Sequence, residues 1–131
     1  MKIIDLTKNI KFLSGKPKLN LEITGLAYHS SQVQPGNVFV AIKGQQADGN
    51  KYIGQALQAG AKVIVSEEKV EVPSKILNLV VPNTRQVLAQ LSANYFGQPS
   101  QSLSLIGITG TNGKTTICYL LEAIFEQANF N

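Results

Sequence analysis

Short apolar runs separated by polar stretches are spread along most of the chain. Compact apolar runs at residues 38–42, 62–66 and 76–81 have the length of buried strands. Alternating apolar and polar residues predict a further strand at 19–23, and residues 25–28 predict a short one. The apolar pattern therefore predicts several short strands in the first hundred residues.

Two helices are predicted between and after these strands. Residues 52–59 place apolar side chains at helical spacing, and Gly60 is a natural C-terminal stop. A second helix begins near Thr84, and Gly97 and Pro99 mark its end. Because strands alternate with helices, we predict a small Rossmann-like α/β domain whose sheet is mixed or mostly parallel.

The same pattern restarts after a polar linker. A strand is predicted at 103–109, followed by a glycine-rich loop and a helix at 114–128. One strand and one helix cannot bury a core by themselves. We therefore predict a first domain at 1–98 and the truncated start of a second domain at 99–131, and expect the chain to be the N-terminal part of a longer protein.

The loop of the second unit, GTNGKTT, has the composition of a phosphate-binding loop. Gly110 and Gly113 allow the backbone to approach phosphate oxygens, and the following helix supplies free N–H groups and its positive dipole end. Lys114 is expected on the β- and γ-phosphates of ATP, and the Thr115 hydroxyl on Mg²⁺. The common form of such loops has glycine where this chain has Ile108. The predicted ATP-binding residues are Gly110, Thr111, Asn112, Gly113, Lys114, Thr115 and Thr116.

Charge and composition narrow the possible partners. Twelve basic and eight acidic residues give a net charge of +4, and only one of the twelve basic residues, Arg85, is an arginine. This composition does not favour nucleic-acid binding, whereas a mild positive field favours an anionic substrate. The single cysteine excludes an internal disulfide, and no apolar stretch approaches the ~20 residues of a membrane span. Without a recognisable signal peptide, we expect a cytoplasmic protein with no membrane insertion, and a monomer by default.

Several motifs resemble those of one enzyme family. The string GITGTNGKTT at 107–116, preceded by a small α/β domain, is similar to the Mur ligases, which use ATP to add amino acids to the peptidoglycan precursor. Within that family the N-terminal part resembles the MurE branch. The matching segments, in family order, are Tyr28-His29-Ser30-Ser31, Pro35-Gly36, Phe39-Val40-Ala41, the loop 44–49, Gln55-Ala56, Gly60-Ala61 and Asn83-Thr84-Arg85.

This resemblance implies a substrate pocket in the first domain. Residues 1–98 would hold the UDP part of UDP-N-acetylmuramoyl-L-alanyl-D-glutamate, with Ser30 at the uridine end. The implied substrate-binding residues are Tyr28, Ser30, Gln45, Gln46 and Ala47. His29, Ser31 and Asn83 replace the family's usual Asp, Arg and Asp, which concerns the detail of the pocket and not its location.

The family's reaction is amide formation through an acyl phosphate. ATP phosphorylates the D-glutamyl carboxylate, and the amine of meso-diaminopimelate or L-lysine then attacks it. The acidic and histidine ligands of Mg²⁺, a carbamoylated lysine and the amino-acid-binding domain would follow residue 131, so no catalytic residue is assigned within 1–131. We expect the chain alone to lack ligase activity. The alternatives are a non-catalytic UDP-sugar-binding module, a MurF-type ligase, or an unrelated P-loop nucleotidase.

Overall fold

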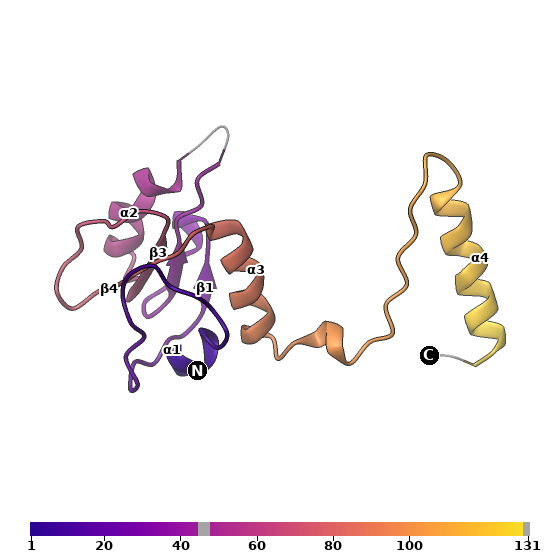
Figure 1. Cartoon of the computed structure of the whole chain (residues 1–131), viewed down its shortest axis with the longest axis horizontal. Helices are drawn as coiled ribbons and strands as arrows, with labels where there is room; N and C mark the ends of the chain where they lie inside the picture. Colours follow the sequence, from indigo (N-terminus) through magenta and orange to yellow (C-terminus); the bar gives the residue numbers. More distant parts are fainter. Residues whose placement is uncertain (45–47, 130–131) are drawn as a thin grey trace. The chain divides into compact units, whose positions relative to one another are not determined.

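A computed structural model of the chain describes residues 1–44 and 48–129. The chain separates into two compact units, Met1–Pro99 (unit 1) and Ser100–Asn131 (unit 2). Unit 1 contains a four-stranded sheet in the order β1-β2-β3-β4, in which every neighbouring pair is parallel (Figure 1). This confirms the predicted Rossmann-like α/β fold. The strands are β1 (Leu26–Ala27), β2 (Val38–Val40), β3 (Val63–Ser66) and β4 (Leu77–Val80).

Helices cover both faces of this sheet. α2 (Ile53–Gln58) connects β2 to β3, and α3 (Thr84–Tyr95) follows β4. A short helix, α1 (Ile3–Leu6), packs with α3. The described residues also contain three 3-10 turns: η1 (Ser30–Gln32), η2 (Gly49–Tyr52) and η3 (Pro99–Gln101).

Alternate strand residues build two separate cores. Val38 and Val40 belong to the cluster that includes residues of α1 and α3, whereas Phe39, between them in sequence, belongs to the cluster with α2. Val63 and Ile64 divide in the same way. Since successive side chains of a strand point to opposite faces, a strand buried on both faces is continuously apolar. This is why the apolar runs at β2, β3 and β4 predicted strands correctly.

The N-terminal segment is structured although its sequence carries no clear pattern. Ile3 and Leu6 of α1 are fully buried. Further along, the Ser14 region pairs with the outer edge of β4, where the N–H of Val80 donates to the Ser14 carbonyl at 2.9 Å. The predicted strand at 19–23 is wrong, because only Glu22 forms a bridge, to Lys2. The segment instead turns to bring Leu21 beside Ile3.

Unit 2 consists of an irregular segment, a loop and the helix α4 (Lys114–Gln127). The predicted strand at 103–109 is wrong for the described residues, in which nothing pairs with it. A strand needs hydrogen-bonded neighbours, so an isolated apolar segment cannot form one. Leu105 and Leu120 are consequently exposed, at 71% and 59%. None of the described helices is long and apolar enough to cross a membrane.

Candidate functional site

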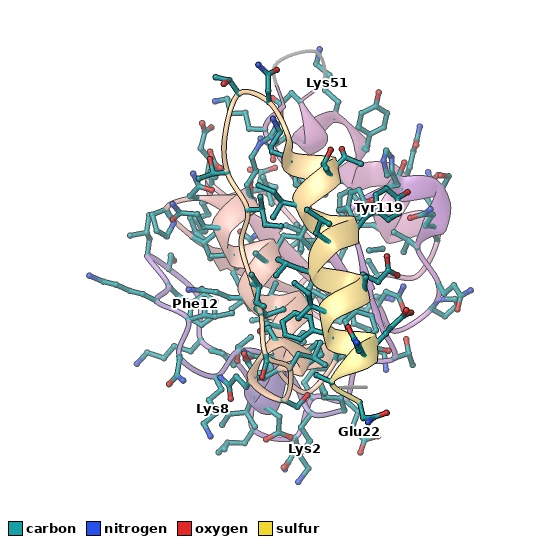
Figure 2. The ribbon with its side chains drawn as sticks, turned by 90° about the vertical axis from the view of Figure 1, so that its right-hand side faces the viewer. Lys2, Lys8, Phe12, Glu22, Lys51 and Tyr119 are labelled. Carbon is teal, nitrogen blue, oxygen red and sulfur yellow. The ribbon has the colours of Figure 1, made fainter. Side chains whose placement is uncertain are left out.

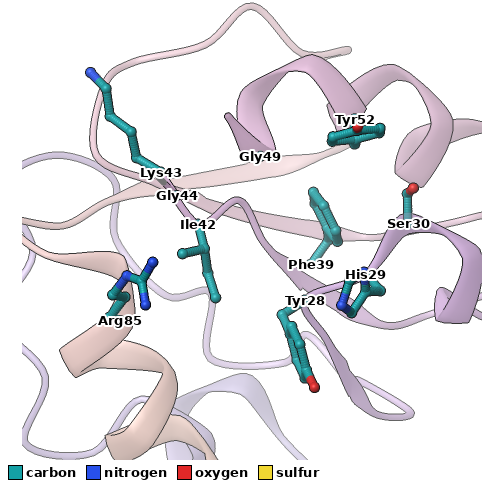
Figure 3. Close-up of a pocket in the computed structure, with 10 residues that line it drawn as sticks. All are labelled: Tyr28, His29, Ser30, Phe39, Ile42, Lys43, Gly44, Gly49, Tyr52 and Arg85. Carbon is teal, nitrogen blue, oxygen red and sulfur yellow. The ribbon is translucent and has the colours of Figure 1, made fainter. Parts of the chain in front are cut away.

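A pocket of about 750 Å³ lies in unit 1 at the carboxyl ends of the strands. Residues 28–30 follow β1, residues 42–44 follow β2, and Arg85 follows β4; all of them line it (Figure 3). η2 supplies a further wall through Gly49 and Tyr52. In open parallel sheets ligands bind outside the carboxyl ends of the strands, so the position suits a binding site.

Ser30 is fixed at the pocket by a neighbouring helix. Its hydroxyl donates a hydrogen bond of 2.9 Å to Oε1 of Gln55 in α2. Beside it, the rings of Tyr28 and His29 lie with centroids 4.9 Å apart. The structure thus brings the predicted residues Tyr28 and Ser30 together in one wall of the pocket. The other predicted substrate residues, Gln45, Gln46 and Ala47, lie outside the described residues.

The loop that follows β2 returns tightly to the strand end. The Gly49 N–H donates to the Ile42 carbonyl at 2.8 Å, and the backbones of Lys43 and Asp48 form an isolated antiparallel β-bridge. A Cβ on Gly49 would lie 2.6 Å from both the N and the O of Ile42, closer than any side chain tolerates. Asp48 also caps η2 by accepting from the Asn50 N–H. These contacts hold the two ends of the loop at the pocket.

The start of α3 is anchored to the end of β3. The N–H and hydroxyl of Thr84 both donate to Oε1 of Glu67, each at 2.9 Å. Asn83 caps the helix by accepting from the Gln86 N–H at 2.9 Å. These anchors fix the first turn of α3, which carries Arg85 into the pocket wall. Arg85 was not among the predicted site residues, although its place four residues after the apolar run 76–81 was a usable signal.

The described wall of the pocket carries positive charge and no carboxylate. Arg85 and Lys43 line it, and none of its described lining residues is acidic. The positive charge of the pocket is separate from the chain's net charge of +4. That net charge comes from residues 1–20, which contain five lysines and one aspartate, whereas basic and acidic residues are equal in number in the rest of the chain. Figure 2 shows Lys2 and Lys8 at the end of unit 1 opposite to Lys51 of η2. The pocket itself therefore favours an anionic ligand.

Aromatic side chains complete the chemistry of the pocket. Tyr28, Phe39 and Tyr52 contribute rings, and Ser30 contributes a hydroxyl held by Gln55. Flat rings suit a nucleobase or sugar face, and the cationic side suits phosphate. No group of three or more His, Cys, Asp or Glu residues that could hold a metal ion occurs among the residues that the structure describes. The described lining of the pocket thus offers rings, a hydroxyl and a positive side, a combination that suits a nucleoside phosphate.

The glycine-rich loop of unit 2 has the geometry of a phosphate cradle. Gly113 precedes α4 with φ +77°, and Gly110 has φ +153°, both in a range that side chains disfavour. The Lys114 ammonium folds back over the loop and donates to the carbonyls of Gly110 and Thr111. The first helical N–H bond is that of Ile117 to Gly113, at 2.9 Å.

The backbone donors of this loop fit a phosphate group. The first N–H groups of a helix have no acceptor within it, so those of Lys114, Thr115 and Thr116 remain available at the positive end of α4. Thr111 and Asn112 form the bend before Gly113. The predicted residues 110–116 thus comprise the loop that carries the Lys114 ammonium on two of its carbonyls and the first three residues of α4.

Curated proteins match this chain along nearly its whole length. Over 128 residues the chain is 42% identical to a UDP-N-acetylmuramoyl-L-alanyl-D-glutamate–2,6-diaminopimelate ligase of Syntrophomonas wolfei, a match that covers 98% of the chain. It is 36% identical over 127 residues to the ligase of the same name from Listeria monocytogenes. The chain spans about a quarter of the length of these relatives, 26% in both cases.

Solved structures give the same family. MurF from Acinetobacter baumannii matches with a TM-score of 0.68 and 28% identity, covering 96% of this chain and 27% of that one. MurF ligase from Thermotoga maritima, solved in complex with ADP, matches with a TM-score of 0.56 and 31% identity, covering 82% of this chain and 24% of that one. The sequence profile described as Mur ligase family, catalytic domain, matches residues 22–96, which is more than half of the chain. This chain therefore belongs to the Mur ligase family.

Proposed function

We propose that this chain is the N-terminal part of an ATP-dependent ligase that adds a diamino acid to UDP-N-acetylmuramoyl-L-alanyl-D-glutamate. Identity of 42% over nearly the whole chain to a ligase of that name carries the proposal. In it, residues 1–98 bind the UDP end of the substrate, and residues 99–131 begin the ATP-binding domain. The division of the chain at Pro99 supports this assignment of two roles.

The pocket of unit 1 is the proposed site for the uridine end. Ser30 offers its hydroxyl from a position fixed by Gln55, and Tyr28 offers a ring beside it. Gln45, Gln46 and Ala47 complete the site in this proposal. Its support is the carboxyl-edge position together with the positive wall, because a diphosphate substrate is an anion.

The loop 110–116 is the proposed site of the ATP phosphates. Backbone N–H groups of residues 112–116 surround the phosphate oxygens, and Lys114 moves from the loop carbonyls to the β- and γ-phosphates. Thr115 is the residue of this loop that would hold Mg²⁺, through its hydroxyl. Bound ATP supplies the phosphoryl group that activates a carboxylate. The residues of this chain contribute binding and orientation, which are the main protein contributions to phosphoryl transfer.

A MurF-type ligase is the second candidate function. The solved structures that match the chain include MurF enzymes, with TM-scores up to 0.68. Their identities of 28% and 31% are lower than the 42% to a diaminopimelate ligase. The two functions differ in the amine substrate, which is a D-alanyl-D-alanine dipeptide in the name of one Acinetobacter baumannii structure.

A product assay with the full-length ligase tests the proposal. The enzyme is given ATP, Mg²⁺ and UDP-N-acetylmuramoyl-L-alanyl-D-glutamate, together with meso-diaminopimelate, L-lysine or D-alanyl-D-alanine in separate reactions. Phosphate release and a product mass increased by one diamino acid are expected. A further reaction contains the precursor that already carries 2,6-diaminopimelate, together with D-alanyl-D-alanine. Turnover in that reaction alone would establish the MurF alternative instead.

A further inference from the structure

The pocket of unit 1 has two chemically different ends. Figure 3 shows Ser30, Tyr52 and the Tyr28–His29 ring pair on one side. Arg85 lies on the other side, and Phe39 and Ile42 lie between the two groups. A ligand that fills the pocket therefore meets rings and a hydroxyl at one end and a guanidinium at the other.

Arg85 is the cation that this pocket keeps available. Its guanidinium makes no hydrogen bond or ion pair that the described part of the chain provides. The neighbouring carboxylate, Glu67, is instead occupied by two hydrogen bonds from Thr84. A guanidinium matches two phosphate oxygens at once, which makes it a strong phosphate ligand.

Lys43, the second cation of the pocket wall, differs from Arg85 because it has a carboxylate partner. Its ammonium lies 3.4 Å from Oε1 of Glu68. In Figure 3 its side chain extends away from Arg85 and from the aromatic end. Part of its charge is therefore compensated by a carboxylate outside the pocket wall.

We propose that Arg85 binds the diphosphate of the nucleotide substrate, and that the nucleotide lies with its nucleoside at the Tyr28–Ser30–Tyr52 end. This assignment rests on the proposed function, because that function places a UDP group in the pocket. It adds a ligand for the diphosphate, at the side of the pocket opposite to the uridine end that the proposed function gives to Ser30. The first turn of α3 supports it, since anions are stabilised near the N-terminus of a helix.

Binding of uridine, UMP and UDP to the full chain tests the assignment by calorimetry at low and high salt. We expect UDP to bind the wild type at least tenfold more tightly than uridine. Arg85→Gln should weaken UDP binding about ten- to hundredfold, as for the loss of one charge-assisted contact, and leave uridine binding unchanged. Arg85→Lys should recover part of the UDP affinity, because it keeps the positive charge but loses the paired N–H donors of the guanidinium.

A charge-matched control distinguishes a direct contact between Arg85 and phosphate from the effect of the protein's overall positive charge. Lys62 is exposed and precedes β3, at the amino end of the sheet. Lys62→Gln removes the same charge as Arg85→Gln and should change UDP affinity less than twofold. Thermal melts of each variant establish that the fold is retained, as expected for a side chain exposed at the start of α3.

Three results would overturn the assignment. They are equal loss of uridine and UDP affinity in Arg85→Gln, unchanged UDP affinity in that variant, or the absence of any nucleotide binding to the wild type. The proposed ligase function is decided separately, by the product assay of the full-length enzyme. A full-length enzyme that forms the expected product while Arg85→Gln binds UDP normally would reject Arg85 alone.

Discussion

Oε1 of Glu67 accepts two hydrogen bonds from Thr84, one from its N–H and one from its hydroxyl, both of 2.9 Å. Glu67 follows β3, whereas Thr84 is the first residue of α3 and is fully buried. The pair therefore ties the carboxyl edge of the sheet to the helix that carries Arg85. A single carboxylate oxygen fixes where one side of the pocket lies.

Replacing Glu67 by alanine is expected to destabilise unit 1 by about 1–3 kcal/mol, because a buried hydroxyl loses its acceptor. Glu67→Gln keeps an oxygen at the same place and should cost less than half as much. Urea titration gives the free energy of unfolding for each variant. Glu68→Ala is the control, since the exposed Glu68–Lys43 pair contributes little. Equal stability of Glu67→Ala and wild type would contradict the proposed anchor.

Gly49→Ala is expected to destabilise unit 1 by about 1–3 kcal/mol. The new Cβ would lie 2.6 Å from backbone atoms of Ile42, so the loop after β2 would have to move. Gly54→Ala is the matched control, because Gly54 lies exposed in α2 with no atom within 4 Å of the added Cβ. It should stabilise by about 0.5–1 kcal/mol, the helix preference for alanine. Thermal melts of both variants measure the difference in stability. A Gly49→Ala variant as stable as Gly54→Ala would contradict the importance of the close approach to Ile42.

Ser30→Ala is expected to weaken binding of the UDP-linked substrate about three- to tenfold, as for the loss of one hydrogen bond. Gln55→Leu should weaken it less, because it removes only the partner that orients the hydroxyl. Calorimetry with UDP-N-acetylmuramoyl-L-alanyl-D-glutamate measures both affinities. Ser31→Ala is the control, since the neighbouring Ser31 does not line the pocket. An affinity unchanged in Ser30→Ala would place the uridine end elsewhere.

Lys114→Ala is expected to lower the ligase activity of the full-length enzyme at least a hundredfold, because the transferred phosphoryl group loses its cation. The KM for the UDP-linked substrate should stay within about twofold in the same proposal, since that substrate is held in unit 1. Phosphate release under saturating ATP measures both quantities. The 131-residue chain alone should release no phosphate above background. Turnover by that chain would contradict the proposal that the ligase reaction needs a further, C-terminal part of the enzyme.

The parallel sheet could be predicted because its strands are buried on both faces. The runs at β2, β3 and β4 are almost continuously apolar, which indicates burial on both faces. Gly60 correctly marked the end of α2, where it adopts φ +95°. The strand at 103–109 was wrong for the opposite reason. An apolar segment predicts burial, but a strand also requires a neighbour with free backbone groups, which lies outside any local pattern.

The binding pocket could be predicted only in part. Ser30 and Tyr28 follow a strand and match a family motif, and the structure places both in the pocket wall. Lys43 and Tyr52 were not assigned, because they are ordinary surface residues by type and gain their position from the order of the strands. Arg85 was not assigned either, although it belongs to a segment that matches the family. The register of parallel strands decides which loops meet, and single residues do not encode it.

The N-terminal segment covers the outer edge of β4, where Ser14 and Val80 exchange backbone hydrogen bonds. Gly15 is pressed so closely on that strand that a Cβ would collide with the Asn78 carbonyl. An open strand edge is a template for pairing with other chains. A shortened version of the protein beginning after Gly15 would therefore expose the edge of β4, whose unpaired backbone groups could pair with other molecules. The resistance of the protein to aggregation, and not only its folding, therefore depends on these first fifteen residues.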